Sequence, residues 1–367
     1  MTISGRKKKA LSIAALLLGL LILAVLVSLS DLRRLSQIGR DLAPEWILLG
    51  AVSAIASFGI FGLCFVFLVR HLIRRSAVLE VLKIGYVSFT FSELLVSAGL
   101  SGYAVRSVHL ATHGISYLET LIYSLARVCI HYFVIFLIFL LAVGVFLPFV
   151  PEGIGGNVII FQCFLFAALL AYALRIFLSP ASRERWVRLV GFCLNSVAAL
   201  RGKDRILGEE DRQGIQRIID GAIRAVFNLG WRTVWPFLLE FVGMGFRFGA
   251  LYSGFLACGY AVDPAIMVVG FIFGTFWAFF VQLPGQLGVM EGAVSATYMA
   301  FGIPFEFALA ACVLYRLTYT LIPFLTGFLF LPRLTWRTLS AFSKGQAITP
   351  DISSLHRTRS AIKKGRQ

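Results

Sequence analysis

The stretch QLPGQLGVMEG, residues 282–292, interrupts an otherwise apolar part of the chain with three glycines, Pro284 and one carboxylate, Glu291. Glycine loosens a helix and proline breaks it. A helix that starts inside an apolar region presents free N–H groups and a positive dipole end, which favour anions. Broken backbone is tolerated at membrane depth only where protein buries it or where it lines a polar cavity. The alternative is a simple loop with Glu291 at the water interface.

The composition is that of a membrane protein. The chain has 367 residues, of which 59% are hydrophobic, and a mean hydropathy of +0.85, whereas soluble domains are about 45–50% apolar. Runs of about 20 apolar residues are long enough to cross the hydrocarbon core. The firm spans are residues 10–30, 46–69, 118–147, 156–178, 233–260 and 305–331. Two further apolar stretches, 84–102 and 265–283, each run into a glycine-rich segment. We therefore predict an all-α, polytopic inner-membrane helical bundle of about eight transmembrane helices.

The net charge of +16 does not indicate nucleic-acid binding, because the basic residues cluster in the loops between apolar runs and so specify membrane topology. The basic N-terminal GRKKK and the basic residues after Pro332 predict cytoplasmic termini. With this orientation, residues 84–116 enter and leave on the cytoplasmic side, and residues 265–303 do so on the outer side. Each segment is either a re-entrant hairpin or a tight pair of crossings.

An internal repeat relates residues 84–147 to residues 265–331. Its landmarks are Gly99, Gly102, Gly114-Ile115, Glu119 and Arg127, which match Gly285, Gly288, Gly302-Ile303, Glu306 and Arg316 at offsets of 186 to 189. Given the predicted topology, the two copies point in opposite directions, as in many transporters.

The predicted domain organisation is simple. We expect one membrane-embedded domain over residues 1–343, with a cytoplasmic loop at 179–232, and a basic, disordered cytoplasmic tail at 344–367. Within the loop, an amphipathic pattern around Trp186 predicts a helix that lies on the membrane interface or packs under the bundle.

Ionisable residues inside apolar helices are candidate functional residues. Arg127, Arg247 and Arg316 lie well inside predicted spans, where an arginine costs roughly 2.5–3.5 kcal/mol and needs a partner. Guanidinium groups suit phosphate because they donate two parallel hydrogen bonds. The alternative is a buried ion pair that only fixes packing, such as Arg316 with Glu291 or Glu240 with Arg247.

Other side chains complete the predicted site. Tyr123 and Tyr319, three or four residues from Arg127 and Arg316, could contact the same headgroup, and Arg106 is a headgroup contact near the cytoplasmic face. The residues for charge balance or proton coupling are Glu93, Glu240 and Glu291. The residues of the broken-helix motif are Gly99, Gly102, Pro284, Gly285 and Gly288. We expect no metal and no cofactor, since His109 and His113 lack a third ligand.

Two stretches, GLSGYAVRSVHLATHGISYLETL and QLPGQLGVMEG followed by GIPFEFALAACVLYR, resemble flippase-like membrane proteins related to the transmembrane half of lysylphosphatidylglycerol synthases. The second half matches the family pattern closely at Pro284, Gly285, Gly288, Glu291, Gly302, Pro304 and Arg316. The first half keeps Gly102, Arg106, Gly114 and Arg127, but has Tyr103 where an acid is usual. The resemblance covers most of residues 10–335 and implies a membrane protein that moves or handles lipid. A short basic tail stands where the synthases have a catalytic domain, so aminoacyl transfer is not expected.

Three functions follow from these observations. The first is translocation across the inner membrane of an anionic phospholipid or a polyprenyl- or hopanoid-type lipid. The second is a non-catalytic subunit or scaffold of a lipid-biosynthesis pathway, which would have lipid-synthesis proteins as partners. The third is a membrane-bound lipid-phosphate transferase, which the outer loops disfavour because they hold no close pair of carboxylates. No nucleotide-binding loop of the GxxxxGK[ST] kind is present, so direct ATP drive is not expected.

Overall fold

The computed structural model describes residues 5–73, 77–94, 100–146, 178–200, 208–279 and 288–343, with short pieces between residues 160 and 176. The regular structure in these residues is helical throughout, as predicted. Four described segments are long and apolar enough to cross a membrane: Pro44–Val69, Tyr117–Val145, Gly230–Ala257 and Phe305–Trp336. They match four of the predicted spans. The predicted span 10–30 corresponds to helix α1 (Gly5–Leu29), and the predicted span 156–178 lies largely outside the described residues.

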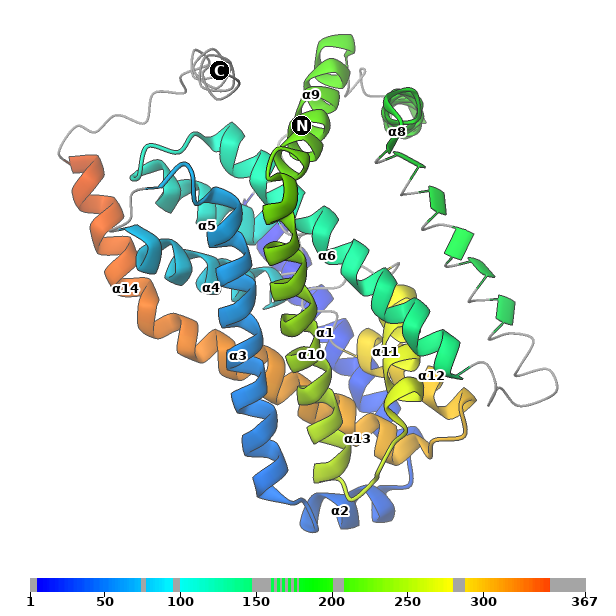
Figure 1. The fold of residues 1–367 in the computed structure, drawn as a ribbon. Coiled ribbons are helices and arrows are strands. Elements are labelled where there is room, and N and C mark those ends of the chain that lie inside the picture. The colour runs from blue at the N-terminus through cyan, green and yellow to red at the C-terminus, as the bar shows by residue number, and fades with distance from the viewer. Residues whose placement is uncertain are drawn as a thin grey trace.

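Helices α3 (Pro44–Val69) and α10 (Val234–Ala257) run side by side through the centre of the molecule (Figure 1). Small residues let them approach closely. The Ser57 hydroxyl donates a hydrogen bond of 2.8 Å to the carbonyl of Gly243. A side chain on Gly243 would place its Cβ 2.5 Å from the Phe61 ring. The buried Ser57 hydroxyl thus has a hydrogen-bond partner on the neighbouring helix, in an interface from which water is excluded.

The two glycine-interrupted segments form two helix pairs. Helix α4 (Val78–Leu94) packs against α5 (Leu100–Ala111), and α11 (Pro264–Phe279) packs against α12 (Val289–Ala300). In each pair the second helix has 12 residues, which span about 18 Å at 1.5 Å per residue. This is shorter than a hydrocarbon core of about 30 Å.

The turn after each pair has the same geometry. Gly114 and Gly302 adopt positive φ angles of 79° and 81°, which end a helix at little steric cost. The N–H of Ile115 donates to the Leu110 carbonyl at 3.2 Å, and the N–H of Ile303 donates to the Tyr298 carbonyl at 3.1 Å. Gly114 and Gly302, two predicted landmarks of the repeat, therefore have the same local structure.

The helices after these turns differ from one another. Helix α6 (Tyr117–Phe146) is continuous. Its counterpart begins as α13 (Phe305–Tyr315), widens into a π-helical turn (Arg316–Leu321) and continues as α14 (Ile322–Ser343). Pro323 has no N–H to donate to the Tyr319 carbonyl. The N–H of Ile322 donates to the Leu317 carbonyl, five residues earlier, which is the hydrogen bond of a π-helix. Single π turns of this kind occur frequently at functional sites.

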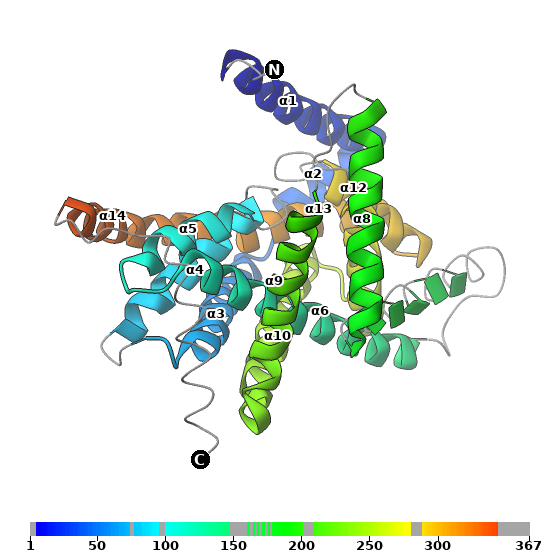
Figure 2. The same cartoon turned by 90° about the horizontal axis from the view of Figure 1, so that it is seen from above.

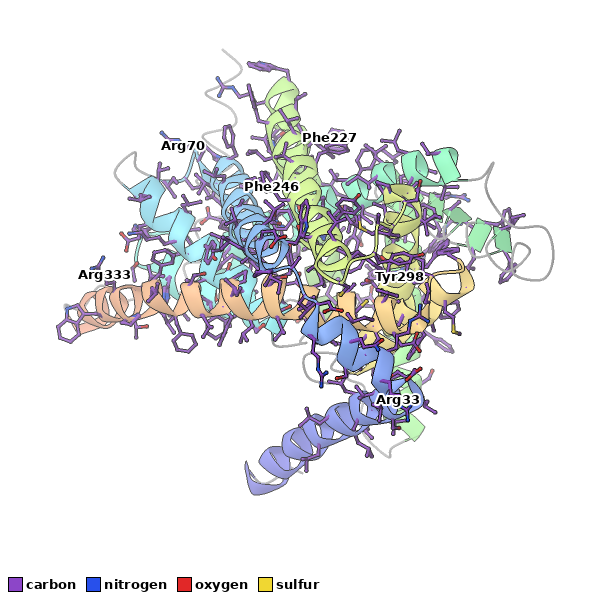
Figure 3. All side chains as sticks on the ribbon, turned by 90° about the horizontal axis from the view of Figure 1, so that it is seen from below. Arg33, Arg70, Phe227, Phe246, Tyr298 and Arg333 are labelled. Atoms are coloured by element: carbon purple, nitrogen blue, oxygen red, sulfur yellow. The ribbon has the colours of Figure 1, made fainter. Side chains whose placement is uncertain are left out.

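Peripheral helices surround this core. They are α1, α2 (Leu32–Arg40), α8 (Pro180–Leu200) and α9 (Glu209–Phe227). Helix α9 packs on α6, and α8 contacts α9 beside the core (Figure 2). The predicted amphipathic helix is thus present as α8, and its place at the membrane interface stays a prediction. The exposed side chains of Arg33, Arg70 and Arg333 lie at the margins of the molecule (Figure 3).

The packing of α5 on α4 predicts a strong size limit at Gly102. A Cβ there would lie 1.9 Å from the Ser92 hydroxyl and 2.3 Å from the Ser88 carbonyl oxygen. Because the backbone carbonyl cannot move without shifting α4, we expect Gly102→Ala to destabilise the protein by about 1–3 kcal/mol. The measurement is the thermal unfolding midpoint in detergent. The matched control is Gly144→Ala on α6, where nothing lies within 4 Å of an added Cβ. Equal midpoints for the two variants would contradict the packing described here.

Candidate functional site

The predicted arginines Arg106, Arg127, Arg247 and Arg316 all lie in the interior of the bundle. Arg106 and Arg127 are 5% and 8% exposed, and the side chains of Arg247 and Arg316 are 11% and 14% exposed. A buried guanidinium stays charged and therefore needs a counter-charge. What each one contacts decides whether it is only a packing residue.

Arg127 is paired with Glu240. Its Nη2 donates to Glu240 Oε1 at 2.9 Å, and His131 Nδ1 contacts the same oxygen. Glu240 is fully buried, although Glu240 Oε2 and Arg127 Nε have no hydrogen-bond partner among the described residues. The guanidinium also lies 3.9 Å from the centre of the Phe89 ring. The pair therefore balances charge but leaves a donor and an acceptor unused.

Arg106 has no carboxylate beside it among the described residues. Its Nη1 donates to the Ser88 hydroxyl at 3.3 Å, and its Nε has no hydrogen-bond partner. Its guanidinium lies over the rings of Phe65 and Phe89, at 5.3 and 5.1 Å from their centres. Arg106 sits one helical turn beyond Gly102, on the face of α5 that meets α4. The close approach of the two helices thus buries the arginine, and its predicted role as a headgroup contact near the cytoplasmic face stays a prediction.

Arg106 and Arg127 therefore form one cluster with an excess of positive charge. Both guanidinium groups lie over the same ring, Phe89. Glu240 supplies one negative charge for the two cations. We call Arg106, Arg127, His131 and Glu240 the inner cluster.

Arg247 lies among one carboxylate and two tyrosines. Its Nε donates to the Tyr315 hydroxyl at 2.9 Å, and its Nη1 donates to Glu93 Oε1 at 3.4 Å. It also lies 5.0 Å from the centre of the Tyr319 ring, and the rings of Tyr315 and Tyr319 are stacked. The suggested pair of Glu240 with Arg247 is wrong. Seven residues separate them on α10, or about 10.5 Å along the axis, so each finds its partner on another helix.

Arg316 and Glu291 form the suggested ion pair, with Nε and Oε1 3.0 Å apart. Glu291 is 2% exposed, so it does not lie at a water interface. It occupies the first turn of α12, three residues after Gly288, where the helix dipole favours a negative charge. The chain's own carboxylate thus occupies the anion-favouring helix start that the motif predicted.

The glycines and proline of the motif are only partly described. Gly99, Pro284 and Gly285 lie outside the described residues. Gly288 is the residue before α12 and has a φ of 76°. A Cβ on Gly288 would lie 2.6 Å from the Gly19 carbonyl oxygen of α1. Gly102 supports the α4–α5 contact described above.

The hydroxyl groups of the two predicted tyrosines lie beside other side chains. The Tyr123 hydroxyl lies 2.7 Å from His71 Nε2. Burial lowers the pKa of His71, and the negative charge of Glu119 opposes this shift. The Tyr319 hydroxyl lies 3.0 Å from the Ser57 hydroxyl, and its ring faces Arg247. The π-helical turn explains the orientation of Tyr319, because it changes the face on which Tyr319 lies relative to Arg316.

Two residues at this site, His131 of the inner cluster and Phe89 beside it, were not predicted from the sequence. His131 follows Arg127 by four residues, so the i, i+4 spacing on α6 was an available signal. Phe89 carried no such signal, because one phenylalanine among 34 is not distinctive. Only the packing of α4 between α3 and α5 places its ring beside two arginines.

Comparison with known proteins adds the family. The family described as the lysylphosphatidylglycerol synthase TM region matches residues 12–327. The chain belongs to this family. The match covers every residue of the inner cluster as well as Arg247, Glu291 and Arg316. Together with the long apolar helices, membership in this family makes the chain a membrane protein related to lipid synthesis or flipping. No curated protein matched the chain.

The inner cluster makes a direct prediction for stability. Glu240→Ala leaves two buried guanidinium groups without a counter-charge, so we expect a loss of about 3–5 kcal/mol. Adding Arg127→Met should recover part of that loss, because the second change removes one of the uncompensated charges. The measurement is again the unfolding midpoint in detergent, for both single variants and the double variant.

A surface pair provides the control. Arg212 and Glu209 lie 3.2 Å apart with side chains 27% and 71% exposed, so Glu209→Ala should cost at most about 1 kcal/mol. For the buried pair, the prediction is contradicted if the unfolding-midpoint changes of Glu240→Ala and Arg127→Met simply add in the double variant, because the two residues are then not coupled.

Proposed function

We propose that this protein moves lipids with an anionic headgroup across the inner membrane, with its N- and C-termini in the cytoplasm. The observation that carries the proposal is the inner cluster, in which Glu240 pairs with Arg127 while Arg106, over the same Phe89 ring, bonds only the Ser88 hydroxyl among the described residues. Family membership supports a role in lipid handling. A phosphate headgroup would supply the negative charge that the inner cluster lacks.

The excess positive charge of the inner cluster is unfavourable in the free protein. Burying an ion without a partner costs several kcal/mol even after relaxation. A phosphate placed at the inner cluster would neutralise the excess charge and accept hydrogen bonds from the unused Nε atoms of Arg106 and Arg127. Charge-assisted bonds of this kind are about twice as strong as neutral ones. Phosphate binding therefore relieves a cost that the free protein carries.

A route through the protein follows from the spacing of charges on α10. Glu240 and Arg247 are separated by about 10.5 Å along this helix. Arg247 in turn contacts Tyr315, the residue before Arg316. A headgroup leaving the inner cluster would meet Arg247 next and Arg316 after it. Glu93 pairs with Arg247 and Glu291 with Arg316, so each carboxylate can pair with its arginine again once the headgroup has passed. Protonation of the same carboxylate can couple the movement of the headgroup to a proton.

The paired helices suit alternating access. We propose that α4–α5 and α11–α12 are oppositely oriented re-entrant hairpins of an inverted repeat, counted with the spans as about eight transmembrane helices. Their short second helices and the matching turns at Gly114 and Gly302 support this arrangement. Two such halves around a central site allow it to open to one side at a time.

This proposal makes the protein a transporter and not an enzyme. Its partners are then membrane lipids and, where the lipid is made nearby, lipid-synthesis proteins. A scaffold role makes a different prediction, because it does not require the positive charge of the inner cluster.

Translocation in proteoliposomes tests the proposal. Phosphatidylglycerol labelled with a fluorophore on an acyl chain is reconstituted with the protein, and a membrane-impermeant reductant reports the outer leaflet over time. We expect the wild type to move the lipid. The Arg106→Gln/Arg127→Gln double variant should be slower by about tenfold or more, because charge-assisted hydrogen bonds to the headgroup are lost.

The control is Arg33→Gln, which removes an exposed arginine on α2 and should leave the rate unchanged. Unfolding midpoints confirm that each variant is folded. If the wild type moves no lipid, or if the double variant matches it, the proposal fails and the scaffold role gains support.

A further inference from the structure

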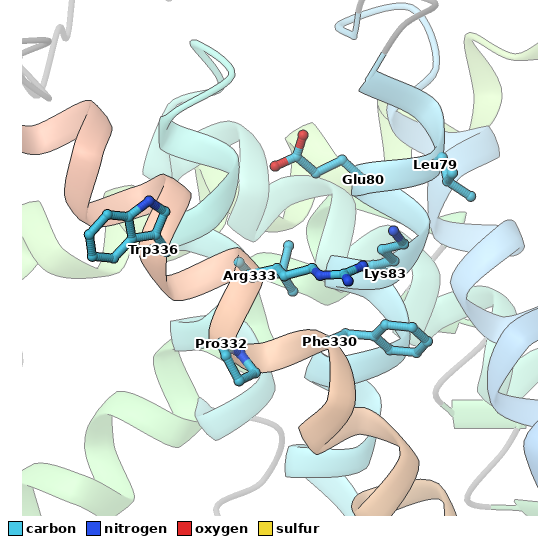
Figure 4. A pocket seen from close by; sticks show the side chains of 8 residues that line it. Leu79, Glu80, Lys83, Phe330, Pro332, Arg333 and Trp336 are labelled. Atoms are coloured by element: carbon cyan, nitrogen blue, oxygen red, sulfur yellow. The ribbon is translucent and has the colours of Figure 1, made fainter.

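A cavity of about 770 Å³ opens between the start of α4 and the middle of α14, outside the inner cluster (Figure 4). This volume lies within the range of about 300–1,000 Å³ that ligand sites commonly have. Lys83 and Glu80 line it from α4, and Arg333 and Trp336 line it from α14. The cavity therefore joins charged groups from two helices that are distant in sequence.

Packing holds the two walls of this pocket in place. The Tyr86 hydroxyl and the Thr326 hydroxyl lie 2.6 Å apart, and the rings of Tyr86 and Phe330 meet edge to face. Lys83 Nζ lies 5.9 Å from the centre of the Phe330 ring. Pro332 lies inside α14, where it removes a helix hydrogen bond and crowds the preceding turn. The pocket forms at that proline.

The lining has the mixed character of a membrane interface. Leu79 and Trp336 are 62% and 75% exposed, beside the two cations. Tryptophan is enriched at the level of lipid headgroups, and lysine and arginine reach from apolar surface toward the same level. An amphiphile with an anionic head and an apolar body matches both parts of the lining.

The charge of the pocket selects its occupant. Lys83 and Arg333 supply two positive charges, and Glu80, 3.8 Å from His113, supplies one negative charge. The excess is positive, which favours an anionic occupant. We propose that this pocket binds the phosphate of an anionic lipid headgroup from the cytoplasmic leaflet, with Lys83 and Arg333 as its ligands and Trp336 against the glycerol and upper acyl region.

This site is separate from the inner cluster but lies near it. Lys83 and Ser88 are five residues apart on α4, or about 7.5 Å along its axis, and Ser88 bonds Arg106. A lipid held at the pocket is therefore close to the inner cluster. The binding step itself stands whether or not the lipid then crosses the membrane.

A local crosslinking measurement tests the pocket. The photo-reactive residue p-benzoylphenylalanine replaces Leu79 in the full chain, which is reconstituted in phosphatidylcholine vesicles with phosphatidylglycerol as the minor component. After illumination, mass spectrometry gives the ratio of the two crosslinked lipids. We expect several-fold enrichment of phosphatidylglycerol over its share of the bilayer. In Lys83→Gln and Arg333→Gln the ratio should fall to that share.

A control separates this site from general electrostatic attraction. Arg70→Gln removes an exposed cation at the end of α3 and should keep the enrichment. Enrichment that survives both Lys83→Gln and Arg333→Gln would overturn the proposal. Inorganic phosphate that abolishes the enrichment at low concentration would overturn the assignment to a lipid, because the site would then favour the free anion.

Discussion

A guanidinium group held inside a membrane protein needs a negative charge beside it, and the interior of this bundle is organised by that need. Glu240 serves Arg127, Glu93 serves Arg247 and Glu291 serves Arg316. Arg106 contacts only a serine hydroxyl and two aromatic rings among the described residues. Three pairs therefore fix the packing of α4, α6, α10, α12 and the π-helical turn, while the fourth arginine leaves the inner cluster positively charged.

Close helix contacts make this arrangement possible. Gly102 lets α5 approach α4 so that Arg106 reaches Ser88, and Gly274 lets α11 approach the Val294 backbone of α12. In lipid, association between helices relies on such packing of small residues, because burying apolar surface gains little there. The glycines thus allow the helices that carry the charged side chains to pack closely, and their role at the site is indirect.

Much of this architecture could be predicted from the sequence. Apolar runs located the long helices within a few residues, and the Gly114 and Gly302 landmarks adopt the same turn. The pair of Arg316 with Glu291 was confirmed. What failed depended on contacts between distant segments. Glu240 pairs with Arg127 instead of Arg247, and Tyr319 faces Arg247 because a π-helical turn rotates it. Helical periodicity gives the face of a residue, but it does not give the helix that packs on that face.

Phosphate binding at the inner cluster is tested most directly by a structure of the protein determined by cryo-electron microscopy in nanodiscs that contain phosphatidylglycerol. We predict density for a phosphate at the inner cluster, with its oxygens about 3 Å from the Nε atoms of Arg106 and Arg127. This prediction would be contradicted by a structure in which both guanidinium groups bond only to groups of the protein and the bound lipids keep their phosphates outside the bundle.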